Sequence, residues 1–231
     1  MIKHKKADFI ELYIVPDKSS LNSLAALKEV PVSIHSPHYN HDFNIFKINK
    51  EKIDIFQNKV IKAADYLNSK FIVLHAGVGE DKKIFKENIN KINDERIIIE
   101  NKPKVGMDNV RCFGYSLEQL KFIKEDCGLK ICLDFAHAAE SAYSQGIDYK
   151  FFWEMLIDKL EPNYFHLSDD FPNNENDEHL NMGDGKLDLK WIKKTLNGLA
   201  QKQDIHLVFE TPKKGNDLKN DLDNIEYFKK L

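Results

Sequence analysis

The segment KICLDFAH, residues 130–137, joins a short apolar run to an aspartate and a histidine three residues apart. Other apolar runs also end in an ionisable side chain: PVSIH (31–35), FIVLH (71–75), RIIIE (96–100), NYFH (163–166) and IHLVFE (205–210). Imidazoles and carboxylates are costly to bury in strands unless they find partners. One arrangement accounts for all of these segments, namely parallel strands whose carboxyl ends meet around a metal centre.

Strand-like runs alternate with amphipathic stretches along the whole chain. The runs are Phe9–Val15, Val30–His35, Phe71–His75, Arg96–Glu100, Lys130–Asp134, Tyr164–Leu167 and His206–Glu210. The stretches with a helical pattern are Ser19–Lys28, Lys50–Leu67, Asp81–Ile92, Ser116–Glu125, Asp148–Leu160, Asp188–Ala200 and Asn216–Lys230. This alternation predicts a parallel sheet with crossover helices.

The position of the ionisable residues at the strand ends favours one α/β fold, the TIM (β/α)8 barrel. In that fold the functional groups gather at the C-terminal ends of the strands. A doubly wound nucleotide-binding sheet is disfavoured, because neither G-x-G-x-x-G nor a Walker A sequence occurs. Only seven strands are evident, so we expect the first strand to be reduced or missing, since the chain opens almost directly into FIELYIV (9–15).

Composition indicates a globular enzyme in one domain, residues 1–231. Hydrophobic residues make up 42% and charged residues 31%, and the formal net charge of −3 gives no global basic field for nucleic acid. No apolar run approaches the roughly 20 residues of a membrane span. The odd number of cysteines, without metal-type spacing, is typical of reduced thiols in a cytoplasmic protein. No obligate protein partner is inferred.

The ionisable residues form an ordered set of metal-ligand types. Histidine, aspartate and glutamate together favour Zn²⁺ or Mn²⁺ over Ca²⁺ or Mg²⁺. This set resembles the metal ligands of the endonuclease IV group, AP endonuclease family 2, of the xylose isomerase-like TIM barrels. The motifs that carry the resemblance are SIHSPH, VLHAG, IIIEN, CLDFAHA, FHLSD, DEHLNMGDG and VFETP. The resemblance covers most of the chain, from about the second strand onward.

The resemblance implies a multinuclear metal site. Endonuclease IV holds three zinc ions with nine ligands, whose counterparts here are His35, His75, Glu100, Asp134, His137, His166, Asp177, His179 and Glu210. Two or three zinc or manganese ions are therefore expected, with Glu100 bridging two of them. Asp177 and His179 would anchor the ion nearest the leaving oxygen.

The function implied by the resemblance is metal-assisted phosphoester hydrolysis, with abasic-site DNA among the expected substrates. Glu100 and Glu210 are the catalytic candidates. The residues expected to contact DNA match those of this family less well than the metal ligands do. Residues 16–20 lack a wedging arginine or tryptophan, and Tyr39 lies one residue after the position of a DNA-intercalating tyrosine. His38, Tyr39 and Lys102 are expected to contact the substrate.

An alternative comes from the same superfamily, which includes isomerases and epimerases of sugars or sugar phosphates. These enzymes use one divalent metal, and their ligands correspond to Glu100, Asp134, His166 and Glu210. The two glutamates would also shuttle protons between adjacent sugar carbons. A binding barrel with a vestigial site is disfavoured by the full ligand set. The five further ligands favour hydrolysis, because an isomerase does not need them.

Overall fold

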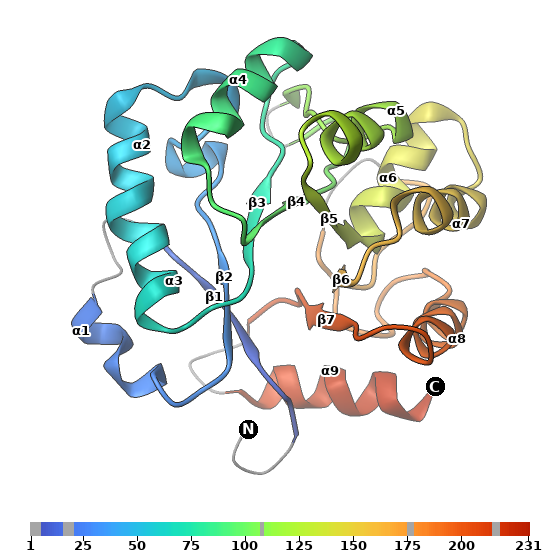
Figure 1. Cartoon of the computed structure of the whole chain (residues 1–231). Helices are drawn as coiled ribbons and strands as arrows, with labels where there is room; N and C mark the ends of the chain where they lie inside the picture. Colours follow the sequence, from blue (N-terminus) through green and yellow to red (C-terminus); the bar gives the residue numbers. More distant parts are fainter. Residues whose placement is uncertain (1–5, 16–20, 107–108, 175–177, 214–217) are drawn as a thin grey trace.

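The computed structural model describes residues 6–15, 21–106, 109–174, 178–213 and 218–231. Seven parallel strands follow one another in sequence order around a nearly closed barrel (Figure 1). They are β1 Ile10–Tyr13, β2 Val32–His35, β3 Ile72–His75, β4 Ile97–Glu100, β5 Lys130–Asp134, β6 Tyr164–Leu167 and β7 His206–Phe209. Within these ranges no ladder joins β7 back to β1. The TIM barrel prediction and its count of seven strands are confirmed.

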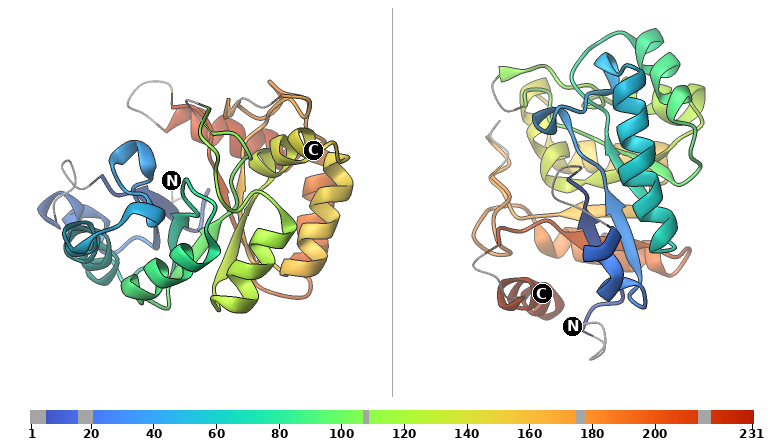
Figure 2. Two further views of the ribbon diagram at one scale, coloured as in Figure 1. Left: turned by 90° about the horizontal axis from the view of Figure 1, so that it is seen from above. Right: turned by 90° about the vertical axis from the view of Figure 1, so that its left-hand side faces the viewer.

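Helices alternate with the strands and lie around the outside of the barrel, as both views in Figure 2 show. The α-helices are α1 Leu21–Leu24, α2 Lys50–Phe56, α3 Lys62–Tyr66, α4 Lys82–Ile92, α5 Leu117–Lys121, α6 Phe135–Gln145, α7 Tyr149–Leu160, α8 Leu189–Ala200 and α9 Lys219–Lys230. Short 3-10 turns are η2 Ala25–Leu27, η3 Tyr39–His41 and η4 Ile45–Lys47, and π turns are η5 Gln57–Ile61 and η7 Phe122–Asp126. None of the helices described has the length and apolar character to cross a bilayer.

Most helices begin where a side chain can cap the free N–H groups of the first turn. Asp81, Ser116, Asp148 and Asp188 accept backbone N–H bonds at the starts of α4, α5, α7 and α8. The predicted helices agree with these elements, except that the predicted starts at Ser19 and Asn216 lie outside the described residues. Helix α6 is an addition, because it starts directly after β5, with the Asp134 side chain as its N-cap.

Successive strand residues point alternately to the two sides of the barrel wall. Outward residues such as Leu74, Ile99 and Leu133 join the large core beneath the helices. Each such side chain contributes roughly 1.5–3 kcal/mol when fully buried. Inward residues form a separate cluster at the barrel's base: Val73, Ile98, Cys132 and Tyr164, with Phe9, Phe71 and Val208 against them.

The next inward layer along the strands is polar. Two residues beyond members of the apolar cluster come His75, Glu100, Asp134, His166 and Glu210. His75 is paired with Glu100 and Asp134 with His166, while the register steps by two residues at β4–β5 and β6–β7, where Glu100 is opposite Cys132 and His166 is opposite Val208. Such a stagger between strands is what closes a sheet into a barrel. The apolar layer therefore forms the floor on which the polar residues stand, at the C-terminal mouth of the barrel.

Candidate metal centre

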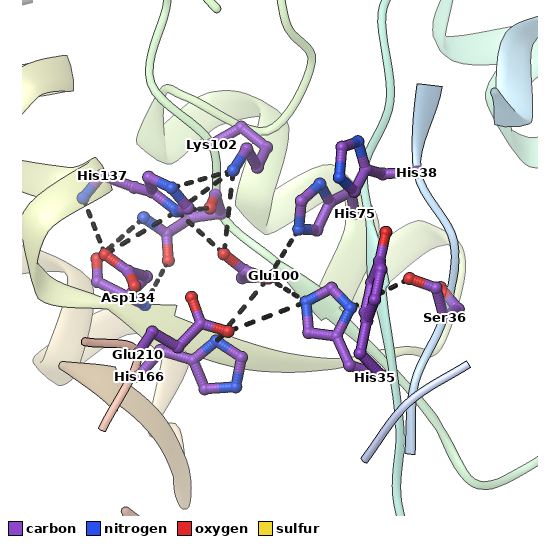
Figure 3. A network of polar contacts seen from close by, with 12 residues as sticks. His35, Ser36, His38, His75, Glu100, Lys102, Asp134, His137, His166 and Glu210 are labelled. Carbon is purple, nitrogen blue, oxygen red and sulfur yellow. Dashed lines mark hydrogen bonds and ion pairs between the residues drawn. The ribbon is translucent and has the colours of Figure 1, made fainter. Parts of the chain in front are cut away.

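Glu100 lies at the middle of the polar layer, fully buried, with contacts on both carboxylate oxygens (Figure 3). Its Oε2 is 3.3 Å from His35 Nε2 and 3.1 Å from His75 Nε2. Its Oε1 is 2.8 Å from His137 Nδ1 and 3.9 Å from Lys102 Nζ. Four side chains from different parts of the barrel thus converge on a single carboxylate.

Two groups of potential ligands share Glu100. One consists of His35, His75 and Glu100, and the other of Glu100, Asp134, His166 and Glu210. Within each group the ligand atoms all lie within 4.8 Å of one another. This spacing allows each group to surround one cation, with Glu100 between the two. Of the nine predicted ligands, the structure therefore brings six into these two groups.

The buried atoms of the second group that lack a hydrogen bond among the residues described include Asp134 Oδ2 and His166 Nδ1. The other carboxylate oxygen of Asp134 accepts the backbone N–H of His137 at 2.7 Å, and so fixes the side chain. His166 Nδ1 lies 3.1 Å from Glu210 Oε1. Buried polar atoms without partners are costly, and a bound cation would satisfy both. These residues therefore fit a divalent transition metal.

Burial and neighbouring charges act on the carboxylates in opposite ways. Burial alone would raise the pKa of Glu100, but the charges of His75 and Lys102, together with contacts from His137 and His35, hold it well below its usual value. Burial raises the pKa of Asp134, and the nearby carboxylates of Glu100 and Glu210 add to that rise. The ionised form of Asp134 is therefore disfavoured by its surroundings, and additional positive charge beside the carboxylate would stabilise it.

Glu11 on β1 is a functional candidate that the sequence analysis missed. Its Oε2 accepts a hydrogen bond from the Tyr164 hydroxyl at 2.6 Å and lies 3.1 Å from His166 Nε2. It also belongs to a third potential ligand group, with His35, His166 and Glu210. Because Glu11 engages Nε2 of His166, the other ring nitrogen, Nδ1, is directed to the Glu100 side of the site. Carboxylates in this position orient metal-binding histidines.

Replacing Glu11 with glutamine is expected to weaken metal binding by about 10–100-fold, the usual effect of losing such a carboxylate partner. Glutamine keeps the shape and can still accept from Tyr164, but it lacks the charge that favours the Nε2–H form of His166. Competition with a chromogenic chelator measures the affinity. An unchanged affinity would show that Glu11 does not orient His166.

Asp94→Asn is the matched control for Glu11→Gln. Asp94 precedes β4, at the end of that strand opposite Glu100, and its carboxylate binds Arg96 at 2.9 and 2.6 Å. Arg96 lowers the pKa of Asp94, so the pair stabilises the fold above the ordinary carboxyl range and loses this effect as pH falls. The control should therefore lower the melting temperature at neutral pH and leave the metal affinity unchanged.

The three predicted substrate-binding residues line one cavity of about 710 Å³, open at the mouth of the barrel. His38, Tyr39 and Lys102 share its wall with Tyr13 and Glu210. The His38 ring stacks on His75, with centroids 4.9 Å apart. Burial, reinforced by the charge of Lys102, lowers the pKa of His38 to about 3. At neutral pH this ring therefore offers a hydrogen bond to a substrate without adding a charge.

The predicted third set of ligands, His137, Asp177 and His179, is only partly placed, because Asp177 lies outside the described residues. The His179 and His137 ring centroids are 5.7 Å apart. His179 Nδ1 lies 2.9 Å from the backbone oxygen of Glu210. His137 and His179 belong to neither of the groups that share Glu100.

The loop that carries His179 is held by Asp169, a buried residue just after β6. Its carboxylate accepts the backbone N–H groups of Gly183, Gly185 and Leu187, all between 2.9 and 3.1 Å. A Cβ on Gly185 would lie 2.5 Å from Asp169 Oδ1, so only glycine fits there. The glycines of the G-D-G sequence therefore shape this loop, which also carries His179, a residue that lines the cavity at the mouth of the barrel.

Residues 5–231 match the family described as xylose isomerase-like TIM barrel. An endonuclease IV from Thermus thermophilus is 20% identical, with a TM-score of 0.75 over 99% of this chain and 90% of that chain. A D-tagatose 3-epimerase-like protein is 19% identical, with a TM-score of 0.71 and the same coverage. An L-ribulose 3-epimerase is 14% identical, with a TM-score of 0.57 over 98% of this chain and 82% of that chain.

No curated protein matches the sequence. At identities of 20% and below, the solved structures establish the fold alone, and they include both nucleases and sugar epimerases. Family membership rests on the match over nearly the whole chain, together with the seven parallel strands and the polar residues at their C-terminal ends. The chain belongs to the xylose isomerase-like TIM barrel family.

Proposed function

We propose that this protein is a two-metal phosphoesterase that resembles endonuclease IV. The observation that carries the proposal is the position of Glu100 in two ligand groups, one of them being His35, His75 and Glu100. A single-metal isomerase has no use for that first group. A pair of ions bridged by a carboxylate is the usual arrangement for displacement at phosphorus.

Bound ions would supply a nucleophile at neutral pH and neutralise the charge that develops on the phosphoryl oxygens. The chain's own residues would hold the substrate and move the proton. Glu210, whose side chain is 20% exposed, reaches the cavity and can accept a proton from the attacking water. Buried Glu100 keeps both ligand groups in place, and Lys102 offers its ammonium to a phosphoryl oxygen.

With metal ions bound the cavity would suit an anionic substrate, because the ions would add positive charge beside Lys102 and outweigh the carboxylates of Glu11 and Glu210 that also line it. Lys102 lines it, and the imidazoles of His35, His75 and His137 open onto it. The proposed substrates are phosphodiesters or phosphomonoesters, with the abasic site of DNA as the first to be tested. A transition state that spreads negative charge over several oxygens gains most from such a site.

A second function has support from one observation. The group of Glu100, Asp134, His166 and Glu210 is complete without His35 and His75, and it includes two glutamates that could act as acid and base on a sugar. This is the ligand set of a metal-dependent sugar or sugar-phosphate isomerase or epimerase. The two functions differ in the number of ions they require and in their substrates.

The test uses protein loaded with zinc and, separately, with manganese. Each form is incubated with duplex DNA carrying one abasic site, with p-nitrophenyl phosphoesters, and with a panel of ketoses and ketose phosphates. Cleavage of a phosphoester that is abolished by chelation, and restored by the metal, is expected. Turnover of a sugar without hydrolysis of any phosphoester would reject the proposal in favour of the isomerase.

A further inference from the structure

We infer that Asn101 is a positioning residue for the ion site formed by Glu100, Asp134, His166 and Glu210, because its side-chain amide holds the backbone of Asp134. The inference rests on the proposed function, in that this group must hold an ion. Asn101 directly follows Glu100 at the end of β4 and is only 1% exposed. A buried amide therefore connects two of the four ligands of this site.

The Asn101 amide continues the sheet where the backbone pairing of β4 and β5 ends. Glu100 is the last residue of β4 in that ladder, opposite Cys132, and the Asn101 N–H then donates to the Cys132 carbonyl at 3.3 Å. Beyond this bond, Asn101 Oδ1 accepts the Asp134 N–H at 2.7 Å and Asn101 Nδ2 donates to the Asp134 carbonyl at 3.0 Å. A side-chain amide carries the same donor and acceptor types as a peptide group. Asn101 thus holds the backbone of Asp134 at two points.

A second connection between Asn101 and Asp134 runs through His137. The His137 N–H donates to Asp134 Oδ1 at 2.7 Å, and His137 Nδ1 lies 3.1 Å from the backbone oxygen of Asn101 (Figure 3). Asp134 is therefore fixed by its backbone and by one of its carboxylate oxygens. The other oxygen, Oδ2, has no hydrogen bond among the residues that the structure describes. This network determines which oxygen of Asp134 is left for the ion.

The effect of Asn101 should be confined to one of the two ligand groups. Buried N–H and C=O groups need hydrogen-bond partners, so without the amide the end of β5 must shift to find others. Asp134 would move with it, since it is both the last residue of β5 and the N-cap of α6. The group of His35, His75 and Glu100 does not contain Asp134. Loss of the amide should therefore weaken one ion and leave the other.

The test measures zinc affinity in Asn101→Ala by competition with a chromogenic chelator, fitted with two dissociation constants. One constant should rise about 10–100-fold, the usual effect of losing a partner of a metal ligand, and the other should stay the same. In the His75→Ala background the single remaining ion should show the same loss. The visible absorption of cobalt(II) in that background should also change with Asn101→Ala, which a general loss of stability would not cause.

Asn88→Ala is the matched control, because it removes another buried asparagine side chain with two hydrogen bonds. On the outer helix α4, Asn88 Nδ2 donates to the Ile45 carbonyl and Asn88 Oδ1 accepts from Lys91 Nζ, both at 2.7 Å. This variant should have a lower melting temperature and both wild-type zinc affinities.

The outcomes separate this inference from the proposed function. Unchanged affinities in a folded Asn101→Ala protein, or equal losses at both sites, would overturn the role of Asn101 and leave the two-metal phosphoesterase intact. A wild-type protein that binds no ion would overturn both. Hydrogen exchange in the metal-free wild type needs no variant: the Asp134 N–H should be protected, and exchange as fast as that of an exposed loop would show that Asn101 does not hold it.

Discussion

Replacing Glu100 with glutamine is expected to empty both ion positions and to abolish hydrolysis. Glu100 is the one residue common to the two ligand groups, and glutamine retains its size but not its charge. Metal ions supply several kcal/mol of transition-state stabilisation, and about 1.4 kcal/mol corresponds to a factor of ten. The expected fall in kcat is therefore roughly 10³-fold or more. Elemental analysis and a phosphoester assay measure the two effects.

The same variant should lose its thermal response to metal. A ligand that binds the folded state raises stability by mass action, so wild-type melting temperature should rise with added zinc. Glu100→Gln should show no such rise, whereas Asp94→Asn, altered at the other end of β4, should show the full rise from a lower starting point. Two ions retained by Glu100→Gln would mean that Glu100 does not bridge the groups.

The fold was predictable because its signals are local. Each strand is a short apolar run, and the six runs after the first carry an ionisable residue at or next to the end that marks the C-terminal mouth of the barrel. The period of two within the strands then places Glu100, Asp134 and His166 in one layer above Ile98, Cys132 and Tyr164. Polar residues at corresponding strand ends must meet, whatever the details of packing.

Helix α6 was missed for a physical reason. Residues Phe135–Ala142 are all buried, including the polar side chains of His137, Glu140 and Ser141, so this helix has no solvent-exposed face over its first two turns. Its N-cap, Asp134, is also the last residue of β5, so the sequence contains no separate start signal. The strand, the helix and the candidate ligand therefore share one residue.

Contacts between side chains on opposite sides of the barrel could not be predicted from the sequence either. Glu11 stood out only as an acidic residue within FIELYIV, and its partners Tyr164 and His166 are more than 150 positions away. The contact between Lys102 and His137 depends on the directions of one side chain from the loop after β4 and one from helix α6. Residue types and their order predict which groups assemble, but not which atoms of those groups face each other.

Replacing His75 with alanine is expected to reduce the metal count from two to one and to abolish phosphoester hydrolysis. His75 belongs only to the group with His35 and Glu100, so the group of Glu100, Asp134, His166 and Glu210 keeps its ligands. The loss of one ion removes half of the charge that stabilises a phosphoryl transition state. We expect a decrease in kcat of roughly 10²–10³-fold, from a loss of about 3–4 kcal/mol.

His41→Ala is the matched control, because it removes another histidine at the mouth of the barrel that belongs to neither group. His41 Nδ1 lies 2.7 Å from the Tyr13 hydroxyl, and its variant should retain two ions. His75→Ala separates the two candidate functions because it creates the single-metal site that an isomerase needs. Sugar turnover that survives in His75→Ala would identify the four-residue group as the working site. Loss of hydrolysis together with one ion would show that phosphoester chemistry depends on the pair.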